Sequence, residues 1–217
     1  MRYLFLAVFI LVSLVHLYAS FIDNKKLRAY TKGAILLSLL GYYVLSSGAP
    51  NWFIIGALVF SLLGDVALIF DGWFAVGGIC FMISHFCFIG AYAPQIDLLR
   101  VPWYVYPLIA AVYAVPITLL FRSVGGHLPK KLYPPMLGYL IVNGLMNCAA
   151  FLQLVSRPCL ATALVYAGAA LFFASDCTLF MVRFHKTKKV WRNHFPVMLT
   201  YIAGEFLIVQ GMLLLLG

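Results

Sequence analysis

Charged residues are scarce in this sequence: Asp, Glu, Lys and Arg together make up 10% of its 217 residues, and only 6 of them are acidic. No polar segment is long enough to fold by itself, which excludes a soluble ligand-binding domain. The chain is instead 65% hydrophobic, with a mean hydropathy of +1.02. A soluble domain of this length would not hide so much apolar surface, so the composition indicates a multi-pass membrane protein.

Several patterns that carry chemistry are also missing. The five cysteines form no CxxC pair, so neither a disulfide framework nor a zinc knuckle is indicated. No HxxxH spacing favours a metal site, and no GxSxG pattern indicates a serine hydrolase. The basic residues behind the net charge of +9 lie in loops beside apolar runs, which makes nucleic-acid binding a poor interpretation. We therefore expect no metal and no nucleic-acid partner.

Apolar runs of about 20 residues recur along the chain without the alternation of a β-barrel, and so predict transmembrane helices. The expected fold class is all-α, with a single transmembrane domain over residues 1–217. We expect eight spans: 3–22, 33–47, 52–70, 73–93, 103–121, 132–155, 160–184 and 195–216. A basic loop should join the first two spans, and a tight turn at Asp71 and Gly72 should join the third to the fourth.

The loop charges predict an orientation. With eight spans, one side of the bundle carries twelve basic residues: Lys25, Lys26, Arg28, Lys32, Arg122, Lys130, Lys131, Arg183, Lys186, Lys188, Lys189 and Arg192. The side of the two termini carries three: Arg2, Arg100 and Arg157. The positive-inside rule then places the basic loops in the cytoplasm and the termini in the lumen or outside. We expect the endoplasmic reticulum membrane in a eukaryotic cell, or the cytoplasmic membrane in a bacterium.

Two aspartates interrupt apolar spans in matching contexts. Asp65 follows Gly64 in SLLGDVALIF, Asp176 follows Ser175 in ALFFASDCTLF, and a leucine comes three residues after each. An acid inside the hydrocarbon region is costly and marks a functional site. At about 1.5 Å per residue, both should lie roughly 8–12 Å below the cytoplasmic interface. A parallel four-plus-four repeat of the helices would turn both toward one central cavity.

Two carboxyl groups in one low-dielectric cavity do not both ionise readily, so one acid and one base are expected at neutral pH. Such a pair suits acid-catalysed addition of water. Buried acids also serve proton or cation coupling in transporters. A third interpretation is structural: each aspartate hydrogen-bonds neighbouring Ser, Tyr or Asn side chains and ties helices together. The residues alone leave these three interpretations open.

Other polar residues in the spans are candidates for the walls of the cavity. Lys32 lies at a span entrance, from which it can reach lipid phosphate or turn inward toward an anionic head group. His85 can orient water or bind a head group, and Glu205 is a third acid deep in a span. The remaining candidates are Asn143, Asn147, Tyr139 and Tyr201. His16, in the first span, receives no functional role.

At these residues the sequence resembles the YhhN-like integral membrane proteins, a family that includes the lysoplasmalogenases. The resemblance rests on FSLLGDVALIF in the third span, GGICFMISHFCFIGAY in the fourth, GAALFFASDCTLFMVRF in the seventh and TYIAGEFLI in the eighth. It implies hydrolysis of the vinyl ether bond of lysoplasmalogens to a fatty aldehyde and glycerophosphocholine or glycerophosphoethanolamine. The partners would then be a lysophospholipid substrate and the membrane lipids.

Carried over by motif, the resemblance makes Asp65 and Asp176 the catalytic pair. Lys32 and His85 are further positions that match the family. Together with the cavity candidates Asn143, Tyr139, Tyr201 and Glu205, which come from the residues alone, they are the expected substrate-binding residues. Two positions depart from the family pattern: no proline follows Lys32 closely, and Glu205 stands where the family usually has glutamine. One neutral aspartic acid can protonate an enol ether and one ionised aspartate can activate water, without a cofactor. The alternative function is a small proton-coupled transporter or a lipid-binding membrane protein.

Overall fold

The computed structural model describes residues 1–70, 72–185, 191–192 and 194–216. Within them the chain forms eight α-helices: α1 (Arg2–Phe21), α2 (Lys25–Ser46), α3 (Trp52–Ala67), α4 (Phe74–Tyr92), α5 (Val105–Val124), α6 (Tyr133–Ser156), α7 (Leu160–Phe184) and α8 (His194–Leu216). Short 3₁₀ helices lie in the connections: η1 (Ala93–Gln95), η2 (Leu98–Arg100), η3 (Gly125–His127) and η4 (Lys130–Leu132). The predicted all-α class is confirmed over this described part, in which no residue belongs to a β-strand.

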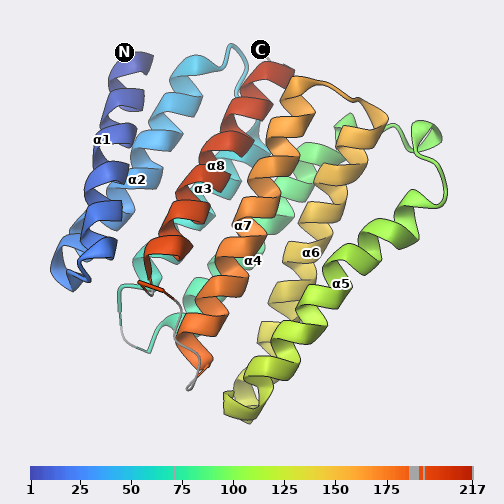
Figure 1. Cartoon of the computed structure of the whole chain (residues 1–217). Helices are drawn as coiled ribbons and strands as arrows, with labels where there is room; N and C mark the ends of the chain where they lie inside the picture. The colour runs from blue at the N-terminus through green and yellow to red at the C-terminus, as the bar shows by residue number, and fades with distance from the viewer. Residues whose placement is uncertain (71, 186–190, 193, 217) are drawn as a thin grey trace.

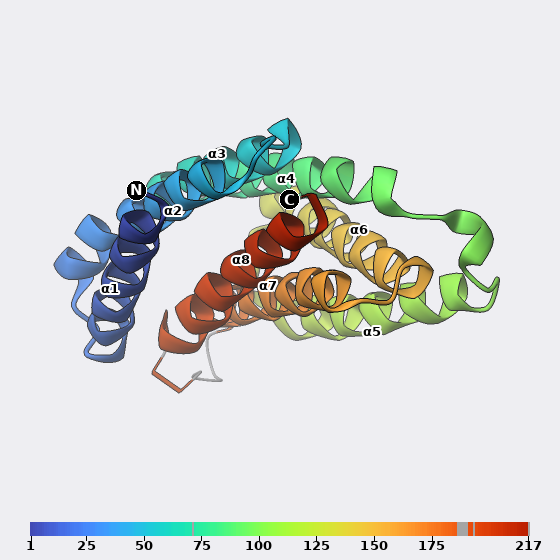
Figure 2. The ribbon, with the colours of Figure 1, turned by 90° about the horizontal axis from the view of Figure 1, so that it is seen from above.

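The helices run side by side, with both termini at the same end of the molecule (Figure 1). Seven of the eight helices in the described chain pack as a ring in the order α1, α2, α3, α4, α6, α7, α8, which α1 closes against α8 (Figure 2). Helix α5 lies outside this ring, against α6 and α7. The end at which α1 finishes and α2 begins, drawn at the bottom of Figure 1, is called the basic end below.

Six helices, α1, α4, α5, α6, α7 and α8, are long and apolar enough to cross a membrane when the described residues are searched. Large apolar side chains stay exposed along their outer faces, among them Leu11, Leu14, Leu108, Val115, Leu119, Leu145 and Leu214. Exposed tryptophans, Trp52, Trp103 and Trp191, lie near helix ends, as is usual at membrane–water interfaces. The chain is a multi-pass membrane protein.

Helices α2 and α3 differ from the spans predicted for them. α2 begins at Lys25, well before residue 33, so the segment expected to be a basic loop is helical. The Asn24 side chain caps it by accepting a hydrogen bond from the Leu27 backbone nitrogen at 3.1 Å, and the lysines and arginine that follow are good helix formers. α3 ends at Ala67, short of residue 70, which puts Asp65 in its last turn.

The connection from α3 to α4 contains Gly72, whose φ of +89° is a left-handed conformation that glycine adopts without strain. The predicted turn therefore has its glycine where such a conformation is needed, while Asp71 lies outside the described residues. Lys186, Lys188 and Lys189, three of the charges used to predict orientation, also lie outside them. The orientation stays a prediction.

Helices α7 and α8 approach to backbone contact. A Cβ atom added to Gly168 would lie 2.6 Å from the Gly204 carbonyl oxygen, and one added to Gly204 would lie 2.8 Å from that of Gly168. Small residues allow such close approach between membrane helices. The Ser175 hydroxyl adds a hydrogen bond to the Val197 carbonyl oxygen at 2.9 Å. The two helices thus form one unit, which carries Asp176 on α7.

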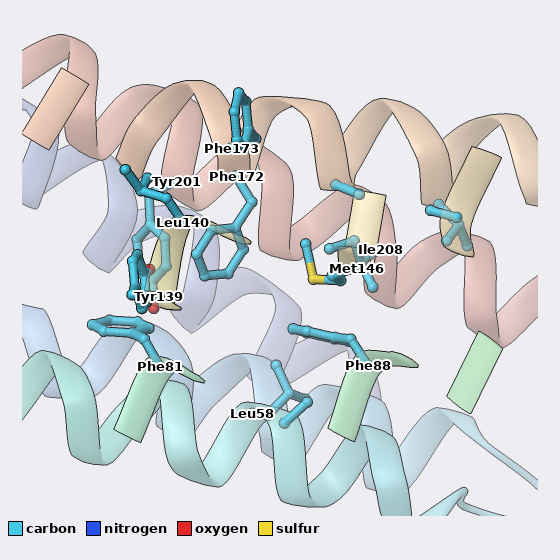
Figure 3. Close-up of a cluster of buried hydrophobic side chains, with 14 of the residues drawn as sticks. Leu58, Phe81, Phe88, Tyr139, Leu140, Met146, Phe172, Phe173, Tyr201 and Ile208 are labelled. Carbon is cyan, nitrogen blue, oxygen red and sulfur yellow. The ribbon is translucent and has the colours of Figure 1, made fainter. Parts of the chain in front are cut away.

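Aromatic rings fill the space between α4 and the α7–α8 unit (Figure 3). The Phe81 ring lies edge-on to Phe172, with centroids 6.2 Å apart, and to Tyr201, with centroids 6.0 Å apart. Phe172 and Tyr201 are themselves 5.2 Å apart and nearly perpendicular. Edge-to-face packing of this kind is the favoured arrangement of aromatic rings. This aromatic cluster forms an apolar wall along the space that the ring of helices encloses.

Candidate active site

A cavity of about 310 Å³ lies inside the basic end, lined by side chains of α2, α3, α4, α7 and α8 together with Leu68 and Phe70. Asp65 and Asp176 both line it, and so do Lys32 and Tyr201. We call it the acidic cavity. Residues more than one hundred positions apart in the sequence thus meet in one space, as expected from the two aspartate motifs. Their catalytic role stays a prediction.

Asp65 has a cation as its partner. Lys32 Nζ lies 3.2 Å from Asp65 Oδ1, and the two side chains are 16% and 3% exposed. The Tyr201 side chain lies beside the same carboxylate. Because a buried charge needs a counterion, this geometry fits an ionised aspartate and a protonated lysine. The side chain of Lys32, which was predicted to bind substrate, therefore points into the space enclosed by the ring of helices.

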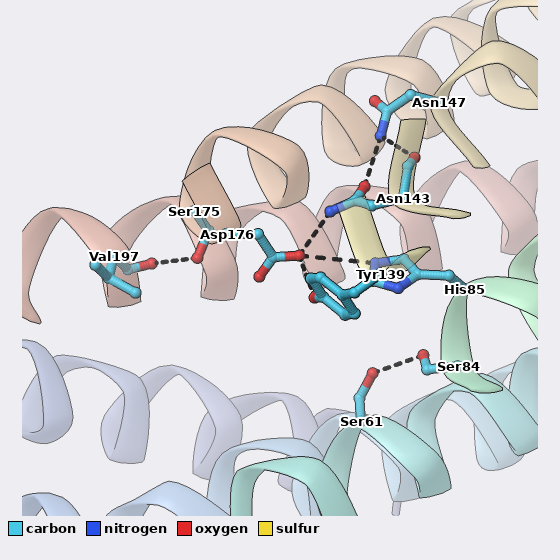
Figure 4. Close-up of polar contacts among 9 residues, drawn as sticks. All are labelled: Ser61, Ser84, His85, Tyr139, Asn143, Asn147, Ser175, Asp176 and Val197. Carbon is cyan, nitrogen blue, oxygen red and sulfur yellow. Dashed lines mark hydrogen bonds and ion pairs between the residues drawn. The ribbon is translucent and has the colours of Figure 1, made fainter. Parts of the chain in front are cut away.

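Asp176 has neutral partners instead, which Figure 4 shows converging on one oxygen. The Tyr139 hydroxyl and the Asn143 amide both donate to Asp176 Oδ2, the latter at 2.6 Å. Tyr139, Asn143 and Asn147 follow one another at four-residue spacing on α6, so they share one face of that helix. The Asn147 amide donates to the carbonyl oxygen and to Oδ1 of Asn143, each at 3.0 Å, and so orients Asn143.

His85 is fully buried on α4, with Nε2 3.9 Å from Asp176 Oδ2. That distance is too long for a hydrogen bond. The imidazole packs edge-on against Tyr139, at a centroid distance of 5.4 Å, and against Phe172, at 4.9 Å. His85 therefore lies next to Asp176 and packs against Tyr139, which donates a hydrogen bond to Asp176.

Glu205 is fully buried on α8, four residues after Tyr201. Neither of its carboxyl oxygens has a hydrogen-bond partner among the described residues. The nearby Ser61 hydroxyl forms a hydrogen bond of 2.8 Å with the Ser84 hydroxyl. Glu205 does not line any of the three cavities described in this section, unlike Tyr201 and Tyr139. A buried carboxyl group without a hydrogen-bond partner is unusual in a folded protein.

Two more cavities adjoin the acidic cavity. One, of about 180 Å³, lies between α4, α6 and α7 and is almost wholly apolar; we call it the apolar cavity. The residues that line both it and the acidic cavity are Leu68, Phe74, Phe81, Asp176 and Leu179. The other, of about 350 Å³, is called the basic cavity; its charged or polar lining residues are His16, Lys25, Arg28, Lys32, Arg183 and His194. Of these, Lys32, Arg183 and His194 also line the acidic cavity.

Of these six basic-cavity residues, only Lys32 was singled out from the sequence as a site candidate. Lys25, Arg28 and Arg183 were counted there as loop charges, His16 received no role and His194 was not considered. Arg28 precedes Lys32 by four residues and Arg183 follows Asp176 by seven, and both spacings return to the same helix face. That periodicity was a signal available for Arg28 and Arg183. For His16 and His194 no such signal exists, because only the packing of α1 and α8 beside α2 brings them here.

A ring of helices, most of them long and apolar enough to cross a membrane, around buried carboxyl groups defines the class: a helical membrane protein with acidic side chains in its interior. Compared with protein-family models, the chain matches that of the YhhN family over residues 27–212. The chain belongs to the YhhN family.

Two curated relatives carry the name lysoplasmalogenase, one from Mycobacterium bovis and one from Mycobacterium tuberculosis. Each is 31% identical to this chain over 170 residues, which cover 76% of this chain and 61% of the relative. The chain thus spans less than two thirds of the length of the curated relatives it matches. No solved structure matches it.

Proposed function

We propose that this chain is a membrane-embedded hydrolase that cleaves the vinyl ether bond of lysoplasmalogens, lysoplasmenylcholine or lysoplasmenylethanolamine. The products are a fatty aldehyde and glycerophosphocholine or glycerophosphoethanolamine. The observation that carries the proposal is that Asp65 and Asp176 line one cavity, which adjoins an apolar cavity suited to a hydrocarbon chain. The name of the two mycobacterial relatives supports the choice of substrate.

The surroundings of the two aspartates suit different roles. Asp65 is paired with Lys32 at 3.2 Å and is assigned as the base, because this counterion favours its ionised form. Asp176 is assigned as the acid, because the partners on its Oδ2 are the neutral donors Tyr139 and Asn143. Its Oδ1 then carries the proton on the side away from those donors (Figure 4).

The reaction proceeds by proton transfers between these groups. Asp176 protonates the β-carbon of the vinyl ether, and the electron pair of the double bond forms the new C–H bond, which leaves an oxocarbenium ion beside ionised Asp65. A water molecule adds to that cation and gives one proton to Asp65. The hemiacetal then collapses: its C–O bond to glycerol breaks, the Asp65 proton moves to the departing oxygen, and the hemiacetal hydroxyl returns its proton to Asp176.

The apolar cavity is assigned to the alkenyl chain. It adjoins Asp176, the proton donor, so a chain held there presents its first two carbons, which form the vinyl ether, to that residue. Gly78 of α4 and Gly138 of α6 line it, and a Cβ on either would meet no atom within 4 Å. The missing side chains at these two positions leave room for the lipid.

The proposal includes the remaining topology. All eight helices of the described chain cross the membrane as one domain over residues 1–217, with the basic end in the cytoplasm. The closely packed pairs α3–α4, with Asp65 and His85, and α7–α8, with Asp176 and Glu205, support a four-plus-four repeat. Labelling of a cysteine added at the C-terminus should succeed only from the lumenal or external side. Labelling from the cytoplasm would reverse the orientation.

The test of function uses purified protein and lysoplasmenylethanolamine in detergent or liposomes. Fatty aldehyde should appear in proportion to the amount of protein. The competing function is a small proton-coupled transporter or lipid-binding protein, which the unpartnered carboxyl group of Glu205 favours. Absence of aldehyde from both head-group forms, together with proton-coupled uptake into proteoliposomes, would replace the hydrolase with the transporter.

A further inference from the structure

The basic cavity gathers cations from helices that are distant in sequence. It lies where α1 and α7 end and where α2 and α8 begin, at the basic end in Figure 1. Lys25, Arg28, Lys32 and Arg183 line it, and no acidic residue appears among its described lining residues. Two of them are paired, Arg28 with Asp23 and Lys32 with Asp65, each at 3.2 Å, while Lys25 and Arg183 are exposed. The excess of positive charge around this cavity favours an anion.

Two of its side chains hold unused hydrogen-bonding groups. Arg28 Nη2 lies 3.2 Å from Oδ1 of Asp23, while the buried Nη1 of Arg28 has no hydrogen-bond partner among the described residues. His16 is 1% exposed; its Nδ1 lies 2.7 Å from the Thr31 hydroxyl, whereas Nε2 is buried and has no partner in the same described set. Buried polar atoms of this kind are normally satisfied, so a ligand is expected to meet them.

The chemistry of the cavity selects an anion with several oxygens. Guanidinium groups bind phosphate through pairs of parallel hydrogen bonds, and two of them, Arg28 and Arg183, line this cavity. Arg183 is held in place by the Phe74 ring, whose centroid lies 5.5 Å from the guanidinium carbon. Its side chain borders the acidic cavity too, so a phosphate here can belong to a molecule whose other part lies between Asp65 and Asp176.

We propose that the basic cavity is a phosphodiester subsite, in which Arg28 and Arg183 bind the head-group phosphate of a single-chain lysophospholipid. This subsite rests on the proposed function for the position of the chain, but its ligand is set by the cations themselves. Three cavities then accommodate one lipid in order: phosphate in the basic cavity, glycerol and ether oxygen in the acidic cavity, and hydrocarbon in the apolar cavity. The glycerol unit of the lipid makes the same connection between its phosphate and its ether oxygen.

The test measures binding to the purified full chain in detergent, with lipids that are not cleaved. The pair of probes is 1-O-alkyl lysophosphatidylethanolamine and the 1-O-alkylglycerol of the same chain length, which lacks only the phosphorylated head group. We expect the phospholipid to bind the wild type at least about tenfold more tightly. Arg28→Gln and Arg183→Gln should each weaken that binding about tenfold, as expected for loss of a charged hydrogen bond, and leave alkylglycerol binding unchanged.

The matched control is Arg100→Gln, since Arg100 also pairs with an aspartate, Asp97, at 3.0 Å, but lies in η2 at the opposite end. It should bind both lipids as the wild type does. Arg28→Lys, which keeps the charge, should retain part of the preference. Unchanged binding of the alkylglycerol by Arg28→Gln and Arg183→Gln shows that these variants remain folded. Equal weakening for both lipids, or an unchanged phospholipid affinity in Arg28→Gln and Arg183→Gln, overturns the subsite.

Inorganic phosphate separates the two sources of the anion. At millimolar concentration it should compete only weakly with the alkyl lysophospholipid. If it binds as tightly as the lipid and with the same dependence on Arg28, the cavity is a site for free phosphate and the head-group assignment is wrong. Because neither alkyl lipid is a vinyl ether, this experiment gives its answer even if the protein hydrolyses no lysoplasmalogen. Conversely, aldehyde release that does not depend on Arg28 would leave the proposed hydrolase standing without this subsite.

Discussion

Asp65 and Asp176 line the same cavity, yet the residues around them differ in kind. Asp65 lies in the last turn of α3 against the ammonium group of Lys32, and its side of the cavity continues into the basic cavity. Asp176 lies within α7 against a hydroxyl and an amide, and its side continues into the apolar cavity. The difference gives the site a polarity: a charged side, which suits the proposed head group, and an apolar side, which suits the proposed alkenyl chain.

This polarity also separates the two carboxyl groups chemically. An ion pair with lysine favours the charged form of a buried aspartate, whereas neutral donors are compatible with a carboxyl group that carries a proton. Two identical side chains in equal surroundings would have no reason to divide the roles of acid and base. The following predictions test that division, beginning with the largest expected effect.

Removing either carboxyl group should have the largest effect on turnover. Asp65→Asn and Asp176→Asn should each lower kcat by about 10²–10⁴, because asparagine keeps the size and most hydrogen bonds but can neither give nor take the proton. The double variant should be scarcely slower than either single variant, since the two residues act as one unit. The measurement is aldehyde release from lysoplasmenylethanolamine.

Asp97→Asn is the control for this comparison, because Asp97 is also paired with a cation but lies outside the ring, in the connection between α4 and α5. It should keep wild-type activity. Near-normal turnover in either Asp65→Asn or Asp176→Asn would mean that the acid–base mechanism is wrong, even though the family assignment would stand.

Lys32→Met should lower kcat by about 10², at the lower end of the range for losing the base. Without its counterion, buried Asp65 is better accommodated in its protonated form, so both carboxyl groups become acids. Lys32→Arg should restore part of the rate because it returns a positive charge. Lys26→Met, on an exposed position of the same helix, should change nothing. If Lys32→Met lowered only the affinity for substrate and left kcat intact, Lys32 would serve the head group and not Asp65.

Much of the architecture could be predicted from sequence, because each transmembrane helix corresponds to a continuous apolar run. The all-α class agrees with what the apolar runs led us to expect, and the gathering of Asp65 and Asp176 in one space agrees with the expectation from the two aspartate motifs. The start of α2 was missed for a local reason: Lys25 and Arg28 are polar but good helix formers, so hydropathy alone reports a loop there. The end of α3 at Ala67 was missed because the apolar run continues past the helix.

The polarity of the site was not predictable, because it depends on which helices are neighbours. α6 packs between α4 and α7, although α5 follows α4 in the chain, and this placement brings Tyr139 and Asn143 to Asp176. The basic cavity joins His16 near the beginning of the chain to Arg183 and His194 near its end. A hydrophobic period reports which face of a helix is buried, but not the partner that buries it.

Filling the apolar cavity should weaken the binding of the alkenyl chain and leave the chemical step unchanged. Gly138→Leu places four carbons where the alkenyl chain is assigned, and displacing two of its methylenes at about 0.8 kcal/mol each raises KM for a long-chain substrate roughly tenfold. The kcat should change little, and a short-chain lysoplasmalogen should be cleaved normally. Gly78→Leu, from the opposite wall on α4, should behave in the same way. Gly48→Leu, at a glycine that meets no atom within 4 Å in the α2–α3 connection, is the control. If KM rose equally for short-chain and long-chain substrates, the assignment of the alkenyl chain to this cavity would be wrong.

The smallest effect is expected at the neutral donors of Asp176. Tyr139→Phe removes one hydrogen bond to Oδ2 but leaves the Asn143 amide in place at 2.6 Å, so the carboxyl group keeps its position. A single neutral hydrogen bond contributes about 0.5–1.5 kcal/mol, which predicts a fall in kcat of roughly 2- to 10-fold. Tyr133→Phe, on a half-exposed tyrosine at the start of the same helix, should leave kcat unchanged. Combining Tyr139→Phe with Asn143→Leu should cost more than the sum of the two in free energy of activation, because Asp176 then loses both groups that orient it. Should Tyr139→Phe instead equal Asp176→Asn in its loss of kcat, the hydroxyl of Tyr139 rather than the carboxyl group of Asp176 would be the proton donor.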